Sequence, residues 1–477
     1  MIDPTPDLKD YQQSDFDTFM LRYLRGDTAC VCAWQAGLGK SLLAILIARA
    51  LHADRVLISG PSISLTSWEK ELRKWWPSAT TLLIAKGADI RKLRDQKVVV
   101  VTHDLIGRND EVRLRLRDWL AQAGTSFGVI DEAQYLRGPA TKRTGGSYGR
   151  GEGAFTHVDK VLLLSGTLIV SWPDDLWTHL ARWMPERIVL DGTRMDYATF
   201  RDRFLKTRQV PIPGAFVKRT QIYGYHEDRM PEFRERIKDF SIKRTKDEAG
   251  LPPLTWRVMD LELAAADRKQ IEAELMDHLP ERLQVLARRS TADPDNEELA
   301  FAFAERLAEY EELWGVAMRV LGVGKAKALC RVLKEKLQNT PRVQGIGIFS
   351  INRKVMDVFD AELKEFGVVR IDGSTPPGLA RARIVDAFQD VQGPRVFNGQ
   401  IDACGTALTL TRGDTCYFPQ LSPIPGANEQ AASRFHRIGQ QNPVDAWIPS
   451  VRGTLDQPLM GILRKKMKTQ AVLNGDN

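Results

Sequence analysis

Residues 29–41 carry the sequence ACVCAWQAGLGKS, an apolar run followed by a glycine-rich turn, a lysine and a serine. The run predicts a β-strand over Ala29–Trp34, and the residues after the turn predict a helix over Ser41–Leu51. A strand, a glycine loop and a helix N-terminus together form a phosphate-binding loop. The residues expected to bind nucleotide phosphates are Gly37, Leu38, Gly39, Lys40 and Ser41. In such a loop Lys40 reaches the β- and γ-phosphates and the Ser41 hydroxyl binds Mg²⁺; the alternative is a glycine turn next to a helix.

An acidic pair follows a second apolar run. Gly128-Val129-Ile130 precedes Asp131-Glu132-Ala133-Gln134, and the carboxyl end of a buried strand is where an α/β sheet places its site. We expect Asp131 to bind Mg²⁺ and Glu132 to orient or deprotonate the attacking water. The alternative for the isolated pair is a solvated acid at a helix N-terminus. Lys40, Asp131 and Glu132 are therefore the candidate catalytic residues of the first half of the chain.

Strand-like and helix-like segments alternate in both halves of the sequence, which predicts parallel sheets covered by helices. The expected strands are Ala29–Trp34, Arg55–Ser59, Val98–Thr102, Phe127–Ile130 and Lys160–Ser165, then Gly345–Ser350, Val368–Ile371, Arg395–Asn398 and Thr415–Phe418. A further helix is expected over Ser67–Trp75. From Pro173 to Leu321 the pattern is mostly helical, with a long amphipathic helix over Glu297–Leu321. The glycine-rich stretch Gly145–Gly153 predicts an exposed loop.

The fold class predicted is α/β, with two lobes joined by a mainly helical middle region. The expected domains are residues 1–262, residues 263–322 and residues 323–477. Two arginines in the last domain, Arg434 and Arg437, lie in the segment QAASRFHRIGQ, residues 430–440. If this segment is helical until Gly439 ends it, both guanidinium groups leave one face. Arginine suits bidentate contact with phosphate oxygens, so one nucleotide is expected to be bound by residues of both lobes.

Composition limits the class of protein only loosely. The chain has 477 residues, is 43% hydrophobic and 27% charged, and has a formal net charge of +7. This mild basic excess is compatible with a polyanionic partner and does not establish one. The five scattered cysteines lack zinc-type spacing and predict a reducing compartment, and Cys30 and Cys32 are expected to be small core residues. We expect no signal peptide and no membrane span.

The order of these motifs resembles that of superfamily-two helicases, and specifically of Swi/Snf-type DNA translocases with RecA-like lobes. The resemblance runs from Leu8 to Lys468, and the QAASRFHRIGQ segment is its most specific part. It implies that Gln12 recognises adenine, that Lys40, Asp131, Glu132, Arg434 and Arg437 are catalytic, and that the two arginines are arginine fingers. The DNA-contacting residues implied are Pro61, Ser62, Thr102, His103, Ser350, Gly373, Ser374 and Thr406. The residues implied to couple hydrolysis to DNA contact are Ser165, Thr167, Gly405 and Gln440.

The resemblance implies an ATP- and Mg²⁺-dependent motor that translocates on double-stranded or forked DNA. Its roles would be DNA repair, recombination, fork processing or protein–DNA remodelling. Details such as Ser165-Gly166-Thr167 and Leu408-Thr409-Leu410-Thr411 resemble the annealing-helicase and fork-remodelling branch. The alternatives are a strand-separating or strand-annealing helicase at forks, and a non-hydrolysing clamp or recruitment protein.

The sequence departs from the family pattern at Trp34, Leu168, Cys404 and Ala407, which puts rate and coupling efficiency in doubt more than the reaction. The short connections between motifs predict a minimal bacterial or phage-like form. We expect a monomeric motor without a membrane partner. Its expected place is the bacterial cytoplasm or nucleoid, or the nucleus of a eukaryote, and we expect no secretion.

Overall fold

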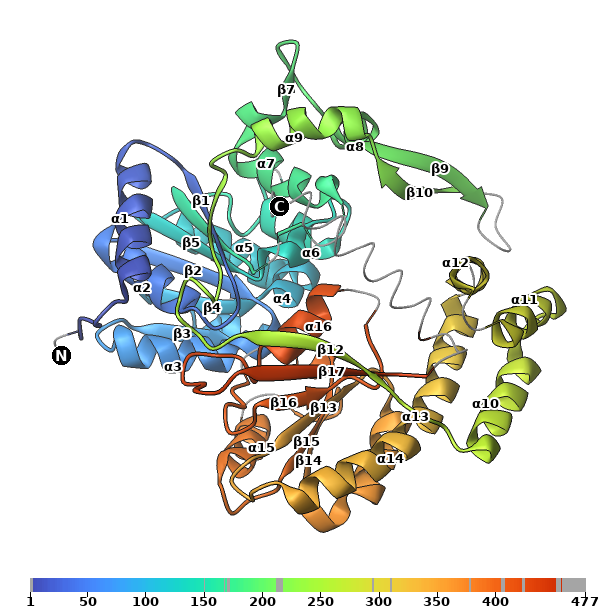
Figure 1. Cartoon of the computed structure of the whole chain (residues 1–477). Helices are drawn as coiled ribbons and strands as arrows, with labels where there is room; N and C mark the ends of the chain where they lie inside the picture. The colour runs from blue at the N-terminus through green and yellow to red at the C-terminus, as the bar shows by residue number, and fades with distance from the viewer. Residues whose placement is uncertain are drawn as a thin grey trace. The chain divides into compact units, whose positions relative to one another are not determined.

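The computed structural model describes residues 3–149, 151–166, 168–169, 172–211, 218–293, 296–308, 311–376, 379–404, 408–422, 425–451 and 456. These residues form two compact units, one ending at Ala249 and the other beginning at Gly250 (Figure 1). Each unit contains a parallel sheet with helices, which confirms the predicted α/β class. No described helix combines the length and the apolar character needed to cross a membrane.

The first unit contains a seven-stranded sheet with the order β11-β1-β6-β5-β2-β4-β3, in which every neighbouring pair is parallel. Its strands are β1 (Ala29–Trp34), β2 (Arg55–Gly60), β3 (Thr81–Ile84), β4 (Val98–Thr102), β5 (Ser126–Asp131), β6 (Lys160–Leu164) and β11 (Ser241–Arg244). The helices of this part are α1 (Asp10–Leu24), α2 (Lys40–Ala50), α3 (Leu65–Trp75), α4 (His103–Arg108), α5 (Asp110–Leu120) and α6 (Lys142–Tyr148). The central strands contain buried apolar runs, such as residues 161–164 of β6 and residues 127–130 of β5, as expected where helices cover both faces of a parallel sheet.

The remainder of the first unit is not mainly helical, contrary to the prediction for the stretch after Pro173. It contains α7 (Trp177–Trp183), β7 (Val189–Leu190), β8 (Thr193–Arg194), α8 (Tyr197–Phe204), β9 (Leu205–Pro211), β10 (Lys218–Tyr225) and α9 (Met230–Arg236). Within the part of the chain that the structure describes, strands β9 and β10 pair with each other and with no other strand, as an antiparallel ribbon. The basic stretch that ends this region is β11, which pairs with β1. Pairing with a distant strand overrides the local helical pattern here.

The glycine-rich stretch from Gly145 is also not the exposed loop that its composition predicted. Its first residues belong to α6, and Gly146 and Ser147 are buried. A Cβ on Gly146 would lie 2.5 Å from the backbone oxygen of Ile106, and a Cβ on Gly107 would lie 2.7 Å from that of Lys142. The glycines are therefore needed because the backbones of α4 and α6 approach closely.

The second unit contains a six-stranded parallel sheet with the order β12-β17-β16-β13-β15-β14. Its strands are β12 (Leu254–Asp260), β13 (Ile346–Ser350), β14 (Val368–Ile371), β15 (Val396–Gln400), β16 (Thr415–Tyr417) and β17 (Val444–Ser450). Its helices are α10 (Ala265–His278), α11 (Glu281–Ala292), α12 (Glu297–Ala308), α13 (Glu311–Asn339), α14 (Arg353–Glu362), α15 (Leu379–Gln389) and α16 (Pro425–Ala432).

The predicted long helix over Glu297–Leu321 is wrong in its bounds. The structure has α12 ending at Ala308 and α13 running from Glu311 to Asn339. The later part of α13 carries Leu329 and Leu333, which are buried in one cluster with Ile346 and Ile348 of β13. Packing on the sheet extends the helix beyond the point where its amphipathic pattern was expected to end.

Candidate functional site

The loop between β1 and α2 has the backbone geometry of a phosphate cradle. Gly37 and Gly39 have φ of 92° and 93°, a region that residues with a Cβ rarely adopt. The Lys40 ammonium donates to the backbone oxygens of Trp34 at 2.8 Å and Gln35 at 3.4 Å. Lys40 begins α2, so its own N–H and that of Ser41 lie in the first turn of a helix, where backbone N–H groups lack intrahelical partners.

Helix α1 packs against this loop through two neighbouring side chains. The Gln12 amide donates to the Leu38 oxygen at 3.0 Å, and the Tyr11 hydroxyl donates to the same oxygen at 2.9 Å. A Cβ on Gly39 would lie 2.6 Å from Nε2 of Gln12. The structure therefore places Gln12 directly against the phosphate loop, where the sequence-based hypothesis needs it for adenine recognition.

A buried carboxylate joins the same region to the edge of the sheet. Asp15 on α1 is 2% exposed and accepts hydrogen bonds from the Arg244 guanidinium at 2.6 and 2.9 Å. It also accepts one from the Trp34 indole at 2.9 Å, and the Trp34 ring lies edge-on to Tyr11. The tryptophan that interrupts the expected loop pattern is thus fully satisfied, by an acid that the sequence-based reasoning did not single out.

Asp131, at the end of β5, is the other predicted anchor of the nucleotide. Its Oδ2 accepts from the Trp68 indole of α3 at 3.0 Å. Burial, and then the neighbouring Glu132 charge, raise the pKa of Asp131 to about 6, while Trp68 and Lys40 oppose this shift. A cation beside this carboxylate would stabilise its ionised form, so the electrostatics favour a positive ligand here.

His103 supports the end of β5 from the neighbouring strands. One ring nitrogen lies 2.6 Å from the Ser59 hydroxyl and the other lies 2.8 Å from the Asp131 backbone oxygen. Burial lowers the pKa of His103 to about 4, so the ring is neutral at physiological pH. Thr102 caps α4 by accepting from the Leu105 N–H at 3.1 Å. Both side chains are buried, and their proposed contact with DNA stays a prediction.

A chain of hydrogen bonds connects the acidic pair to the end of β6. The Gln134 amide donates to Oε2 of Glu132 at 2.6 Å, and its oxygen accepts from the Ser165 hydroxyl at 2.6 Å. Strand β6 lies between β1 and β5, so Ser165 follows a strand beside both predicted nucleotide-binding segments. Thr167, the other coupling residue predicted here, lies outside the described residues.

The donor set fits ATP and Mg²⁺. A serine hydroxyl and a carboxylate are the oxygen ligands that Mg²⁺ uses together with phosphate and water, and the described residues contain no cluster of three His, Cys, Asp or Glu able to enclose a metal alone. Two positive-φ glycines and Lys40 suit a polyphosphate. The remaining predicted residues of this unit are Pro61, which is half-buried, and Ser62, which is exposed, where β2 continues into the short 3₁₀ helix η1 (Ser62–Ser64).

The arginine segment of the second unit differs from its prediction. Helix α16 ends at Ala432, so Arg434 and Arg437 do not share one helical face. The turns that follow use short-range backbone bonds, from the Arg434 N–H to Ala431 and from the Phe435 N–H to Ala432. The side chain of Phe435 is fully buried, and a Cβ on Gly347 would lie 2.5 Å from its ring. Burial of this ring, together with the 3₁₀-type bonding, replaces the expected helix.

Burial and hydrogen bonds fix the positions of Arg434, Arg437 and Gln440. Arg434 is 2% exposed, and Arg437 is half-buried with its guanidinium 3.5 Å from the Thr409 hydroxyl. The Gln440 amide donates to the oxygens of Gly413 at 2.8 Å and Phe435 at 3.0 Å. Gln440 therefore closes the turn that carries the two arginines, and its predicted coupling role stays untested.

The loop after β14 contains the predicted DNA-contacting residues Gly373 and Ser374, and both are exposed. Asp372 fixes this loop by accepting from the Ser374 N–H at 2.8 Å and from its hydroxyl at 2.5 Å. Arg370 lies beside Asp372 and, with these hydrogen bonds, lowers the pKa of that carboxyl to about 2. Ser350 ends β13 and is buried. Gly405 and Thr406 lie outside the described residues.

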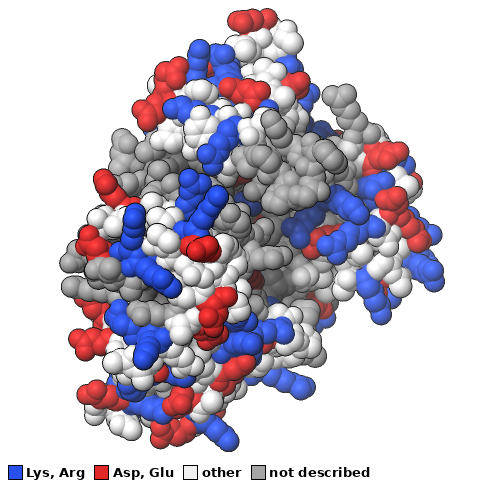
Figure 2. All heavy atoms as spheres, turned by 90° about the vertical axis from the view of Figure 1, so that its right-hand side faces the viewer, with Lys and Arg blue, Asp and Glu red and all other residues white. Residues whose placement is uncertain are grey.

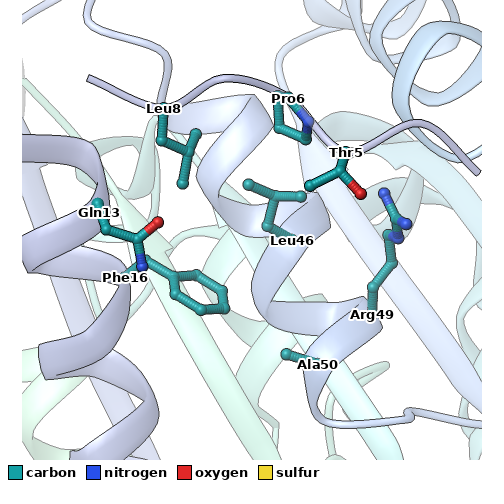
Figure 3. Close-up of a pocket in the computed structure, with 8 residues that line it drawn as sticks. All are labelled: Thr5, Pro6, Leu8, Gln13, Phe16, Leu46, Arg49 and Ala50. Atoms are coloured by element: carbon teal, nitrogen blue, oxygen red, sulfur yellow. The ribbon is translucent and has the colours of Figure 1, made fainter. Parts of the chain in front are cut away.

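A cavity of about 380 Å³ lies beside α1 and α2, and its lining contains no residue of the phosphate loop (Figure 3). It is lined by Thr5, Pro6, Leu8, Gln13, Phe16, Leu46, Arg49 and Ala50. Gln13 lines it, whereas the preceding residue, Gln12, faces the phosphate loop. None of the residues predicted to bind nucleotide or DNA lines this cavity.

Sequence reasoning missed three supports of the site. Gln134 was recognised only as part of an acidic motif, although its position two residues after Glu132 places it beside that carboxylate. Trp68 is predicted only as part of the helix Ser67–Trp75, and the sequence gives no sign of its bond to Asp131. The Asp15–Arg244 pair joins residues 229 positions apart, and no local signal in the sequence indicates such a contact.

Comparison with known proteins agrees with the resemblance noted from the motifs. A DNA annealing helicase and endonuclease ZRANB3 from Mus musculus is 27% identical over 467 residues, which is 95% of this chain and 40% of that protein. The Protein CHROMATIN REMODELING 19 of Arabidopsis thaliana is 26% identical over 536 residues, which is 98% of this chain and 69% of that protein. The solved Sulfolobus solfataricus SWI2/SNF2 ATPase core in complex with dsDNA is similar with a TM-score of 0.43 and 19% identity, covering 99% of this chain and 94% of that chain.

The chain spans about 40% of the length of the ZRANB3 proteins that it matches. The family model for the SNF2-related domain matches residues 11–298 of the 477, which is more than half of the chain. The chain therefore belongs to the SNF2-related domain family.

Proposed function

We propose that this chain is an ATP-dependent motor that hydrolyses ATP and translocates on double-stranded DNA. The observation that carries the proposal is the hydrogen-bonded chain from Glu132 through Gln134 to Ser165, beside a phosphate loop in a member of this family. A binding protein needs only the loop, whereas a motor needs the acidic pair and a connection from it to a second segment. The proposed setting is DNA repair, recombination, fork processing or protein–DNA remodelling, in a nucleoid or a nucleus.

The predicted nucleotide-site residues of the first unit each have a role in this proposal. Residues 37–39 present N–H groups to the phosphates, and Lys40 exchanges its two loop oxygens for phosphate oxygens. Ser41 and Asp131 are the proposed Mg²⁺ ligands, and the ion supplies neutralisation of phosphate charge when it is bound. Glu132 orients the attacking water and receives its proton.

In this proposal Gln134 couples the position and charge of the Glu132 carboxylate to Ser165. Its amide donates to the Glu132 carboxylate and its oxygen accepts from Ser165, so a change in the position or charge of Glu132 alters both bonds. Arg434 and Arg437 are the proposed arginine fingers, which stabilise transition-state charge on the transferred phosphoryl group. The DNA contacts are proposed to be made to the backbone and to be insensitive to sequence.

The test is ATP hydrolysis with and without duplex DNA for the unchanged chain, Lys40→Ala and Arg437→Ala. We expect DNA to stimulate hydrolysis strongly, and the stimulation to fall as salt rises because phosphate contacts release counterions. Lys40→Ala and Arg437→Ala should lose at least about a hundredfold in rate. Full DNA-stimulated hydrolysis by either variant would overturn the assignment of that residue. Absence of phosphate release at saturating DNA would favour the non-hydrolysing clamp instead.

A strand-annealing or strand-separating activity at forks is the second candidate. Its support is the 27% identity with proteins described as DNA annealing helicases. Displacement of a triplex-forming strand reports translocation without unwinding, and strand displacement on forked and blunt duplexes reports separation. Triplex displacement without fork unwinding or annealing would favour the pure translocase.

A further inference from the structure

The β9–β10 ribbon of the first unit has no role in the proposed ATP chemistry. It lies between α8 and α9 in the sequence and extends away from the helices and the large sheet of its own unit (Figure 1). Its base is anchored: Leu205 is buried in the core of the unit, and Ile222 and Tyr225 pack against that core. The ribbon thus has a packed attachment, and neither of its strands pairs with a further strand among the described residues.

The charges of the ribbon are all of one sign. Residues 205–225 contain Lys206, Arg208, Lys218 and Arg219 and no aspartate or glutamate. Lys206 and Arg208 are exposed, and neither forms an ion pair with a carboxylate of the described residues. The partner of Arg208 is instead a neutral residue of the facing strand: its Nε donates to the Gln221 amide oxygen at 2.9 Å.

The arginines of the adjoining helices behave differently. Four arginines in or next to α8 and α9 form ion pairs with nearby acids: Arg201 with Asp202, Arg203 with Glu232, Arg229 with Asp228, and Arg236 with Glu232. On the face drawn in Figure 2, basic and acidic side chains are likewise interspersed. The ribbon carries cations and no acid, so its charge is complementary to a polyanion.

An exposed aromatic ring accompanies these cations. The register of the ribbon shifts between Ile222 and Gly224, which leaves Tyr223 as the extra residue of a bulge. Tyr223 is 57% exposed, and the Arg208 guanidinium lies 5.9 Å from its ring centre. A bulge of this kind redirects a side chain, and here it presents a ring and a cation together.

We propose that the β9–β10 ribbon is a DNA-contacting arm, in which Lys206 and Arg208 bind backbone phosphates and Tyr223 stacks on an unpaired base. The proposal rests on the proposed function, because a DNA motor brings such a strand to this unit. A phosphodiester chain supplies the repeated anions that two unpaired cations need, and exposed bases supply flat faces for the ring. DNA with a junction between duplex and single strand offers both features, so it is the substrate class expected to use the whole arm.

The test compares the unchanged chain with Lys206→Ala/Arg208→Ala, with Tyr223→Ala, and with Arg91→Ala/Lys364→Ala. The last variant is the matched control, since it removes the same charge from two exposed residues outside the ribbon. Binding to labelled blunt duplex and forked DNA is measured over a range of salt concentrations. Circular dichroism checks that each variant is folded, which is expected because the changed side chains are exposed.

We expect the ribbon double variant to reduce the slope of log affinity against log salt by about two, since each lost phosphate contact removes about 0.9. Tyr223→Ala should leave that slope unchanged and weaken binding to forked DNA about tenfold more than binding to blunt duplex. Equal behaviour of the ribbon variants and the control would overturn the arm while leaving DNA-stimulated hydrolysis, and hence the proposed function, intact. If the unchanged chain neither binds DNA nor hydrolyses ATP faster with it, both proposals fail.

Discussion

The Asp15–Arg244 pair provides a quantitative test of how the phosphate loop is held. Removal of Arg244 by Arg244→Ala leaves a carboxylate that is 2% exposed, with the Trp34 indole as its remaining partner described here. Leaving one buried charge of a pair uncompensated costs about 3–5 kcal/mol. We expect Arg244→Ala to reduce the local stability of α1 and β1 by an amount in this range.

Asp15→Asn should reduce the stability by less, because the charge left without its partner is then Arg244, which is more exposed to solvent than Asp15. The Arg244 side chain is 28% exposed and lies 3.8 Å from a carboxylate oxygen of Glu248. Loss of a hydrogen bond to a charged group costs about 2 kcal/mol. The double variant removes both charges, so it should be more stable than Arg244→Ala alone despite carrying one more substitution.

Hydrogen exchange of peptides from α1 and β1, followed by mass spectrometry, measures these local opening free energies without assuming two-state unfolding of a chain with two units. Arg73→Ala is the matched control, because its ion pair with Glu69 lies on the surface with the arginine 79% exposed, and such pairs contribute about 1 kcal/mol or less. The reasoning is refuted if Asp15→Asn costs as much as Arg244→Ala, or if the two effects simply add.

Three further predictions concern the pH profile, the coupling chain and the helix contact. Trp68→Phe removes a hydrogen bond that lowers the pKa of Asp131 from a position already raised to about 6, so the acid limb of ATP hydrolysis between pH 5 and 8 should move to higher pH; an unchanged limb would contradict this. Gln134→Ala should reduce DNA stimulation of hydrolysis more than basal hydrolysis, because it cuts the link between Glu132 and Ser165, and an equal loss of both rates would argue against coupling. Gly146→Ala should destabilise the first unit by roughly 1–3 kcal/mol in urea unfolding, since its Cβ meets backbone at 2.5 Å. Gly145→Ala is the matched control and should cause no such loss, because a Cβ on this exposed residue meets no atom within 4 Å outside its own stretch of helix.

The sequence predicted best those elements whose signal is local. The predicted bounds of the strands Ala29–Trp34, Val98–Thr102 and Val368–Ile371 are confirmed. The first two are largely apolar and buried, as a continuous apolar run indicates, whereas the third contains Arg370 and is only half-buried at three of its four residues. Helix α2 begins one residue before its predicted start. The alternation of strand-like and helix-like segments predicts the α/β fold class. It also predicts that the phosphate loop and the acidic strand end belong to one sheet.

Elements that are stabilised by residues far away in the sequence could not be predicted from such local patterns. Strand β11 is short and basic, and it exists because it pairs with β1 from more than 200 positions away. The segment around Arg434 and Arg437 has helical spacing, yet the buried Phe435 ring and the glycines that admit it impose turns. In both cases tertiary contact decides between conformations that the local sequence leaves close in energy.

The substitution at Trp34 illustrates how a departure from a family pattern can be compensated elsewhere. The motif that this segment resembles usually has an acidic residue at the position of Trp34, three residues before Gly37 of the phosphate loop. In this chain a carboxylate of α1 lies against the tryptophan itself, because Asp15 accepts hydrogen bonds from the Trp34 indole and from Arg244. The Trp34 backbone oxygen meanwhile holds the ammonium of Lys40 at 2.8 Å. A buried carboxylate is therefore present next to Trp34 in this chain, so the departure at Trp34 is poor evidence for a degenerate site.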